Sequence, residues 1–321
     1  MDNQNRSVSD NGNEGSLHMT AIKTTNLTKQ YGEQTALNEF DLKIEHGEIF
    51  GFLGPNGAGK STTIDIFLDF IRPTDGRVVV ADHDPQDSPL EVRRNIGVLP
   101  DDYSLYDSLT GSEHIELAKD LNESDEDTNA LLSRVGLADA SDQPAGNYSK
   151  GMAQRLAFGM ALVGDPDVLI LDEPSTGIDP NGVQDIRELI REEAASGTTI
   201  FFSTHILEQV EAICDRVAII NEGEPVAVDT ISGLRETFDT QSILTLSVDG
   251  TPPELDLHDL NGVSQVEHSG DTIRVYLRDP QVKSTAITQV EASGASISDI
   301  EIKEASLTEL FSRLTTGGDG A

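Results

Sequence analysis

The sequence predicts an α/β fold in which a sheet carries a glycine-rich loop, followed by a smaller α+β unit. Three observations support this prediction. Residues 48–71 have the pattern of a strand, a glycine-rich loop and a helix. Residues 168–171 (VLIL) are a second buried-strand pattern and end in two acidic residues. After residue 241, short segments alternate between apolar and polar residues, which is the period of a strand.

The loop GPNGAGKST matches the nucleotide-binding pattern GxxxxGK[ST] in its required place between a strand and a helix. Glycines let successive N–H groups turn towards a polyphosphate, and the helix N-terminus adds further donors. Lys60 is placed to reach the β- and γ-phosphates, and the Ser61 hydroxyl to ligate Mg²⁺. A glycine-rich turn without a ligand is the alternative. The predicted binding residues are Gly54, Pro55, Asn56, Gly57, Ala58, Gly59, Lys60, Ser61 and Thr62.

Composition restricts the classes of function. The 321 residues include 57 acidic and 22 basic side chains, a formal charge of -35. Direct binding to nucleic acid or to an anionic membrane needs basic surface, so neither is expected. Such an excess of acid predicts adaptation to a salt-rich cytoplasm, where salt screens carboxylate repulsion. The single cysteine, Cys214, lies in an apolar stretch and is expected to be a buried, reduced thiol, which fits a cytoplasmic location.

The first residues give no signal peptide, because they lack an apolar core and a basic start. Residues 1–19 are expected to be a disordered acidic tail, with Met19 as an alternative start. No run approaches the roughly 18 apolar residues that span a bilayer. Residues 20–50 predict antiparallel strands flanking the strand of the P-loop. Tyr31, at the first turn, is either an ordinary turn tyrosine or a residue that stacks on a nucleobase.

Residues 76–87 predict a strand and a solvated polar loop rather than a metal site. A short apolar run at 96–99 ends in Pro100 and Asp101. The charged, amphipathic residues of about 103–160 predict an inserted helical lobe. Within it, Ser149 is a candidate N-cap, and the helix start beside it is a weak candidate anion site.

Two carboxylates follow the buried strand at 168–171. Ligands sit at the carboxyl ends of strands in α/β sheets, so Asp172 is placed to hold Mg²⁺ through water and Glu173 to polarise an attacking water. An acidic turn without a function is the alternative. His205 follows the next predicted strand at the same edge of the sheet, although a lone histidine there is usually structural.

The segments GPNGAGKST, YSKGMAQR, VLILDEPSTGID and STH, in this order, resemble the nucleotide-binding subunit of an ATP-binding cassette (ABC) transporter over about 22–237. The resemblance implies a P-loop ATPase core at 20–237 with an antiparallel β subdomain and the inserted helical lobe. It implies ATP and Mg²⁺ as cofactors, with Tyr31 stacked on adenine and Asp172 supporting Mg²⁺. Glu173 would be the general base and His205 a contact of the γ-phosphate.

Such cassettes pair head to tail, as a homodimer or with a second cassette subunit. The resemblance therefore implies that Ser149, Lys150 and Gly151 of one subunit close over ATP bound to the other, with Asp179 at the seam. ATP would hold the pair closed and hydrolysis would release it. The resemblance also implies an integral membrane permease as partner and a peripheral position on the cytoplasmic face of the membrane.

Two departures from the family pattern concern these segments. Asp101 stands where the family usually has Gln, and Lys150 and Met152 replace Gly and Gln of the motif usually written LSGGQ. Both resemble the branch of the family that drives exporters. The expected function is therefore an ATPase subunit that drives export of drugs, lipids or ions.

A small α+β domain is expected at 238–321, with strands at 242–248, 271–277 and 296–302 and a helix at 281–292. A last helix should open with a capping box at 306–309. The unit shows no catalytic pattern, and regulation or support of the dimer is a hypothesis for it. Relatives in iron–sulfur cluster assembly, the alternative function, usually lack such a domain. Chromosome or translation ATPases would need a coiled-coil insertion or a second cassette.

Overall fold

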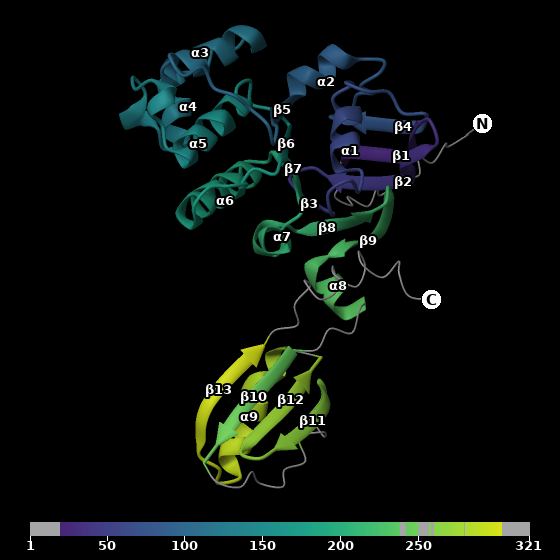
Figure 1. Ribbon diagram of the computed structural model, residues 1–321, viewed down its shortest axis with the longest axis vertical. Helices are drawn as coiled ribbons and strands as arrows, with labels where there is room; N and C mark the ends of the chain where they lie inside the picture. Colours follow the sequence, from purple (N-terminus) through teal and green to yellow (C-terminus); the bar gives the residue numbers. More distant parts are fainter. Residues whose placement is uncertain (1–19, 238–241, 250–256, 258–259, 279, 304–321) are drawn as a thin grey trace, which may run out of the picture.

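The computed structural model describes residues 20–237, 242–249, 257, 260–278 and 280–303. They form three sheets with helices around them (Figure 1). The expected tail at 1–19 and the expected last helix after 304 lie outside the described residues. In the part that the structure describes, no helix is both long and apolar enough to cross a membrane.

The central sheet has six strands in the order β5-β6-β7-β3-β8-β9. The first five are parallel, and β9 runs antiparallel to β8. Helices cover this sheet, so its strands read as continuous apolar runs rather than alternating ones. The strands are β5 (Ile96–Leu99), β6 (Val168–Asp172), β7 (Thr199–Thr204), β3 (Ile49–Leu53), β8 (Arg216–Asn221) and β9 (Glu224–Thr230).

A second, antiparallel sheet has the order β2-β1-β4, with β1 (Thr20–Tyr31), β2 (Gln34–Glu45) and β4 (Asp75–Val80). The expectation that the first strands flank the P-loop strand is wrong, because β1 pairs with β2 on one side and β4 on the other, and neither β1 nor β2 pairs with β3. Their apolar residues instead pack across to the central sheet. The Phe40 and Phe52 rings, for example, meet edge to face with centroids 5.7 Å apart.

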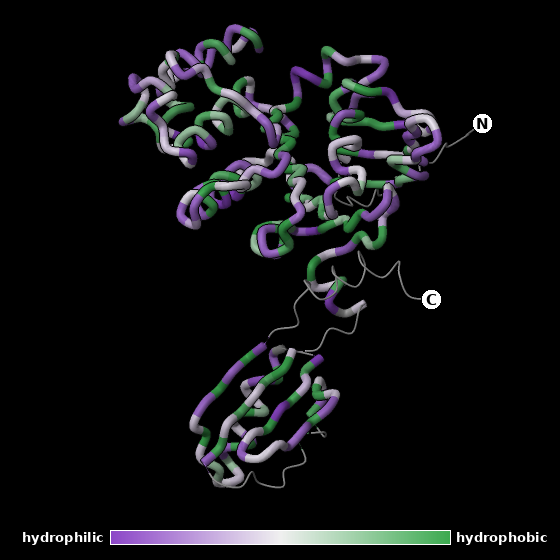
Figure 2. Tube along the Cα trace, in the orientation of Figure 1, coloured by the Kyte–Doolittle hydropathy of each residue, from purple (hydrophilic) through white to green (hydrophobic). Residues whose placement is uncertain are grey.

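The helical lobe consists of α3 (Gly111–Asn122), α4 (Thr128–Arg134) and α5 (Lys150–Ala161), with two single turns, Ala138–Ala140 and Ala145–Asn147, between α4 and α5. The lobe lies to one side of the central sheet, next to α6 (Pro180–Ala195) (Figure 1). Its helices carry both hydrophobic and hydrophilic residues (Figure 2), and their apolar faces join the core beneath the sheet. The other helices are α1 (Lys60–Phe67), α2 (Pro89–Asn95), α7 (Leu207–Ile213) and α8 (Ile231–Thr237).

A buried ion pair joins the lobe to the central core. Arg134, the last residue of α4, donates two hydrogen bonds to the carboxylate of Glu193 on α6, one of them from Nε at 2.7 Å. The Glu193 side chain is only 1% exposed. Burial raises the pKa of Glu193, and the adjacent guanidinium opposes that rise.

The C-terminal sheet is antiparallel, in the order β11-β12-β10-β13. Its elements are β10 (Ser242–Val248), β11 (Val263–Ser269), β12 (Thr272–Leu277), a turn at Pro280–Val282, α9 (Lys283–Ala292) and β13 (Ile297–Lys303). Alternate residues of β10, among them Leu244 and Leu246, pack with Ala286 and Val290 of α9. The sequence pattern predicted β10, β12, β13 and α9 to within two residues at each end, but it predicted neither β11 nor the separate turn before α9. The predicted fold class, an α/β core with an antiparallel β subdomain and an α+β unit, is confirmed.

Candidate active site

The P-loop connects β3 to α1, and two of its glycines are required by contacts with the backbone. A Cβ at Gly54 would lie 2.6 Å from the Ile220 carbonyl oxygen, and one at Gly59 would lie 2.7 Å from that of Ala36. Gly59 also has φ +109°, which a side chain disfavours. As the N-cap of α1 it offers no side-chain acceptor. The first N–H groups of α1 therefore remain available to an anionic ligand.

Lys60 is buried within this loop. Its Nζ donates to the carbonyl oxygens of Gly54 at 2.7 Å and Pro55 at 3.3 Å. It also lies 3.9 Å from Oε1 of Glu173. Burial lowers the pKa of Lys60, whereas the carboxylates of Glu173, Asp172 and Asp101 oppose that change. The lysine thus places a cation between the loop and the acidic end of β6.

Glu173 follows β6 at the carboxyl edge of the sheet, with φ +48°, an uncommon angle for a residue with a side chain. Its N–H donates to the Ser203 carbonyl oxygen at 2.9 Å, which holds the backbone of Glu173 beside the end of β7. Both side-chain oxygens accept hydrogen bonds: Oε1 from His205 Nδ1 at 2.7 Å and Oε2 from Thr204 Oγ1 at 3.0 Å. The structure therefore brings Glu173 and His205 into contact. No sequence motif indicates a role for Thr204. The one feature that could have pointed to it is its position at the end of β7.

Asp172 and Ser61 line one cavity of about 440 Å³ beside α1 and β5. A hydroxyl and a carboxylate there are the hard oxygen donors that suit Mg²⁺, so these residues fit the predicted ion. Burial, helped by the negative charges of Glu173 and Asp101, raises the pKa of Asp172. Asp101 itself is exposed just after β5 and Pro100. It is close enough to influence both Asp172 and Lys60 electrostatically.

A second cavity, of about 680 Å³, extends from the P-loop to the turn that joins β1 and β2. Tyr31 lines it and is 49% exposed, while the Lys29 ammonium lies 4.9 Å from the centre of its ring. The sequence did not indicate the residues outside the P-loop that line this cavity with Tyr31, and no motif singles them out. They are Gln34, Thr35, Ala36 and Glu222.

The residues expected to act in trans line neither cavity. Ser149 is the N-cap of α5, as predicted, because its Oγ accepts from the Met152 N–H at 3.2 Å. Asp179 caps α6, which begins at Pro180, and Asp179 Oδ1 accepts from two N–H groups at 2.9 and 3.0 Å. The two helix starts touch one another.

Glycines allow this approach between α5 and α6. A Cβ built on Gly151 would lie 3.9 Å from the Cα of Gly182, and one on Gly182 would lie 3.8 Å from the Cα of Gly151. The Lys150 ammonium packs directly over Gly177, in the loop between Glu173 and α6. The expected trans segment is therefore in contact with the loop that follows the candidate catalytic carboxylate.

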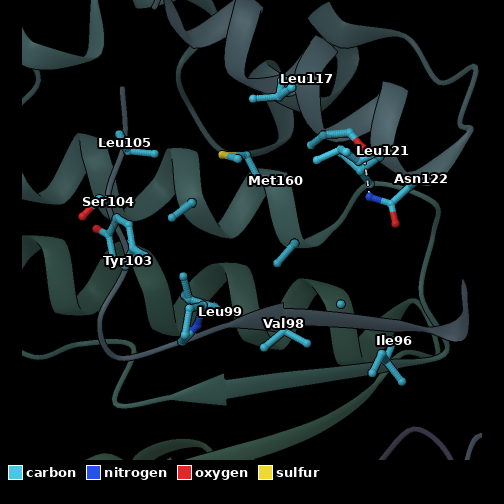
Figure 3. Close-up of a pocket in the computed structure, with 16 residues that line it drawn as sticks. Ile96, Val98, Leu99, Tyr103, Ser104, Leu105, Leu117, Leu121, Asn122 and Met160 are labelled. Atoms are coloured by element: carbon cyan, nitrogen blue, oxygen red, sulfur yellow. Dashed lines mark hydrogen bonds between the residues drawn. The ribbon is translucent and has the colours of Figure 1, made fainter. Parts of the chain in front are cut away.

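A third cavity, of about 310 Å³, lies between β5 and the helical lobe. Figure 3 shows Leu117 and Leu121 of α3 and Met160 of α5 on one side, with Val98 and Leu99 of β5 on the other. Leu121 is 77% exposed at its edge. Pro100, the residue before Asp101, also lines this cavity.

Known proteins resemble this chain in sequence and in structure. A family model described as ABC transporter matches residues 37–176. The daunorubicin resistance ATP-binding protein DrrA2 of Streptomyces coeruleorubidus is 32% identical over 305 residues, 92% of this chain and 95% of that protein. The bacitracin transport ATP-binding protein BcrA of Bacillus licheniformis is 34% identical over 311 residues, 93% and 98% of the two chains.

Solved structures agree with these relatives. The ATP-binding subunit of an ABC transporter aligns with a TM-score of 0.62 and 30% identity, over 68% of this chain and 94% of the other. A dimeric ATP-binding cassette bound to ADP and Pi aligns with a TM-score of 0.58 and 25% identity, over 65% and 98%. These matches favour a transporter subunit over the iron–sulfur alternative. The chain belongs to the ABC transporter family, as its ATP-binding and ATP-hydrolysing subunit.

Proposed function

We propose that this ATPase subunit drives an exporter whose cargo is a drug-like, lipid or ionic compound and whose channel is a separate permease. The observation that carries the proposal is the near full-length similarity to proteins named for daunorubicin resistance and bacitracin transport. That similarity covers more than nine-tenths of the chain and so extends past the catalytic core into the C-terminal unit. We place the complex on the cytoplasmic face of the membrane.

The geometry supports a role for each candidate residue in ATP hydrolysis. We propose that the P-loop N–H groups and Lys60 bind the phosphates, and that Ser61 and Asp172 hold Mg²⁺, which neutralises phosphate charge when bound. Glu173 then orients and deprotonates the attacking water, because its carboxylate is held at the edge of the sheet by two donors. His205 positions Glu173 through one of those bonds. Tyr31 offers a ring for the base.

Closure of two subunits would complete the site. We propose that Ser149, Lys150 and Gly151 of a second subunit approach the γ-phosphate, with Asp179 at the seam. The support is the N-terminus of α5 at Ser149 and the lysine beside it, both favourable to an anion. Because each chain carries a formal charge of -35, pairing is opposed by repulsion that salt reduces. We therefore propose that the protein works at high salt and has no nucleic-acid partner.

The apolar cavity in Figure 3 is where we place the permease contact. Its exposed rim includes Leu121, and Tyr106 nearby in sequence to α3 is 63% exposed. An apolar segment of the permease inserted there would lie beside Asp101 and thus near the catalytic edge. Movement at the nucleotide could then reach the membrane subunit through β5 and the lobe.

The experiment is to trap the ATP-bound complex and identify its partner. Glu173→Gln keeps the shape of the side chain but removes the base, so the protein should bind ATP, hydrolyse it very slowly and accumulate as closed dimers. Co-purification from detergent-solubilised membranes at high salt should recover a polytopic membrane protein in an ATP-dependent manner. Glu192→Gln, an exposed position on α6, is the matched control and should turn over normally. Unchanged hydrolysis in Glu173→Gln, or only non-membrane partners, would contradict the proposal.

A further inference from the structure

Two chemically different groups of residues line the 680 Å³ cavity. The P-loop supplies N–H groups and the Lys60 ammonium, which suit phosphates. The lining also includes the Tyr31 ring, the amide of Gln34 and the carboxylate of Glu222. A carboxylate next to the phosphates of a nucleotide would repel them. Glu222 is therefore compatible with a nucleotide only if it faces the nucleoside part.

The turn that carries Glu222 is held in place from two sides. It is the two-residue hairpin loop between β8 and β9, in which Glu222 has φ +50° and Gly223 has φ +81°, as a type I′ turn requires. The Gly223 N–H donates to the Ala58 carbonyl oxygen of the P-loop at 3.0 Å. Its carbonyl oxygen accepts from the Asn38 N–H of β2, also at 3.0 Å.

The same contacts tie this hairpin to the hairpin that carries Tyr31. The Asn38 side-chain amide donates to Glu224 Oε1 at 2.7 Å, so β2 contacts both the turn and the start of β9. A Cβ on Gly223 would lie 2.6 Å from the Ala36 carbonyl oxygen, which shows how closely the two hairpins approach. Tyr31 and Glu222 therefore come from different sheets but are fixed relative to the P-loop and to each other.

An aromatic ring alone does not distinguish one purine from another, because every base offers a π-face. The Lys29 ammonium lies over the Tyr31 ring, so the ring can stack a base on its other face. A carboxylate only accepts hydrogen bonds, and it rewards a ligand that presents an N–H or O–H donor at that point. Adenosine has such donors in its exocyclic amino group and in its ribose hydroxyls.

We propose that Glu222 is a specificity-determining residue of the nucleotide site: its carboxylate accepts a hydrogen bond from an N–H or O–H group of the nucleoside. This inference rests on the proposed use of the cavity for ATP. It assigns base or sugar discrimination to the β8–β9 turn and leaves stacking to Tyr31 and phosphate binding to the P-loop. The protein would then recognise both the phosphates and the nucleoside of the bound triphosphate.

The test compares affinities rather than activity. Competition against a fluorescent nucleotide, at fixed salt and Mg²⁺, gives the relative affinity of ATP, of purine riboside triphosphate, which lacks the amino group, and of 2′-deoxy-ATP and 3′-deoxy-ATP, which each lack one hydroxyl. The variants are Glu222→Asn, which tolerates the left-handed turn but is too short, and Glu222→Gln, which keeps an acceptor without the charge. Glu33→Ala removes an exposed carboxylate that does not line the cavity and is the matched control.

The original protein should prefer ATP by about tenfold over the analogue that lacks the relevant donor, as expected for a hydrogen bond to a charged group. That preference should fall to within about twofold in Glu222→Asn and to an intermediate value in Glu222→Gln. If the variants lose the preference for ATP over purine riboside triphosphate, the contact is with the base. If they lose the preference for ATP over a deoxy analogue, the contact is with the ribose. Removing one negative charge should raise the affinity for all four nucleotides alike. The decisive quantity is therefore the ratio of the affinity for ATP to that for each analogue.

Two outcomes would overturn the inference. One is a preference that persists in Glu222→Asn, and the other is an original protein that shows no preference among the four nucleotides. A failure of the proposed function looks different, because then none of the proteins, Glu33→Ala included, would bind any nucleoside triphosphate.

Discussion

Replacing Arg134 by methionine should destabilise the protein because it leaves the Glu193 carboxylate buried without its cation. Breaking a fully buried ion pair from one side costs about 3–5 kcal/mol. Here the Glu193 side chain is 1% exposed but that of Arg134 is 31% exposed, so water can reach part of the site. We therefore expect Arg134→Met to reduce the free energy of unfolding by about 2–4 kcal/mol at neutral pH.

The same variant should show a characteristic pH dependence. Burial raises the pKa of Glu193 in the folded state, and Arg134 holds that rise in check. A carboxyl group with a raised folded-state pKa favours folding when it is protonated, and this contribution is lost as pH rises through the folded-state value. Without Arg134 the pKa rises further. The penalty of Arg134→Met should therefore be larger at about pH 8 than at about pH 5, where more Glu193 is protonated.

Urea unfolding followed by circular dichroism measures both effects, since the chain has no tryptophan to report by fluorescence and urea does not change ionic strength. The double variant Arg134→Met/Glu193→Gln should recover most of the lost stability. Arg94→Met is the control, because its pair with Glu91 is exposed and should contribute below about 1 kcal/mol. The reasoning fails if Arg134→Met is no less stable than this control, or if its loss is the same at both pH values.

Three further changes test the site and the proposed permease surface. Lys60→Ala should abolish detectable ATP binding in the fluorescence competition assay, since no other P-loop side chain is cationic, and retained affinity would exclude that role. Thr204→Val removes one of the two donors that hold Glu173; kcat should fall about tenfold with KM little changed, whereas a rise in KM alone would point to binding. Leu121→Glu should prevent recovery of the membrane partner without affecting ATP hydrolysis by the isolated subunit, and unimpaired recovery would remove the cavity of Figure 3 from the interface.

The arrangement of the candidate active site could be predicted from sequence largely because its parts are local. The P-loop pattern lies within nine residues, and Asp172 and Glu173 follow directly from a buried strand. In a parallel sheet, strand ends meet at one edge, so the approach of His205 to Glu173 also follows from the pattern. Thr204 was missed because a threonine at a strand end has no distinctive spacing.

Long-range features escaped prediction for physical reasons. Period-two alternation identified β1 and β2 as strands, but it does not say which sheet a strand joins. The two-residue turn that brings Glu222 to the cavity is separated from Tyr31 by most of the catalytic core in sequence. Similarly, the pair of Arg134 and Glu193 depends on how the lobe docks against α6, and helical periodicity contains no information on docking.

The glycine contact between the starts of α5 and α6 has a mechanical consequence. With no side chains between Gly151 and Gly182, the two backbones meet almost directly, and Lys150 closes over Gly177 alongside them. A displacement of the loop after Glu173 towards α5 would therefore displace the start of α5 as well, because there is no space between them to absorb it. Motion of the core would therefore reach the lobe through the direct contact between α5 and α6, and not only through the segments of chain that connect the lobe to the core.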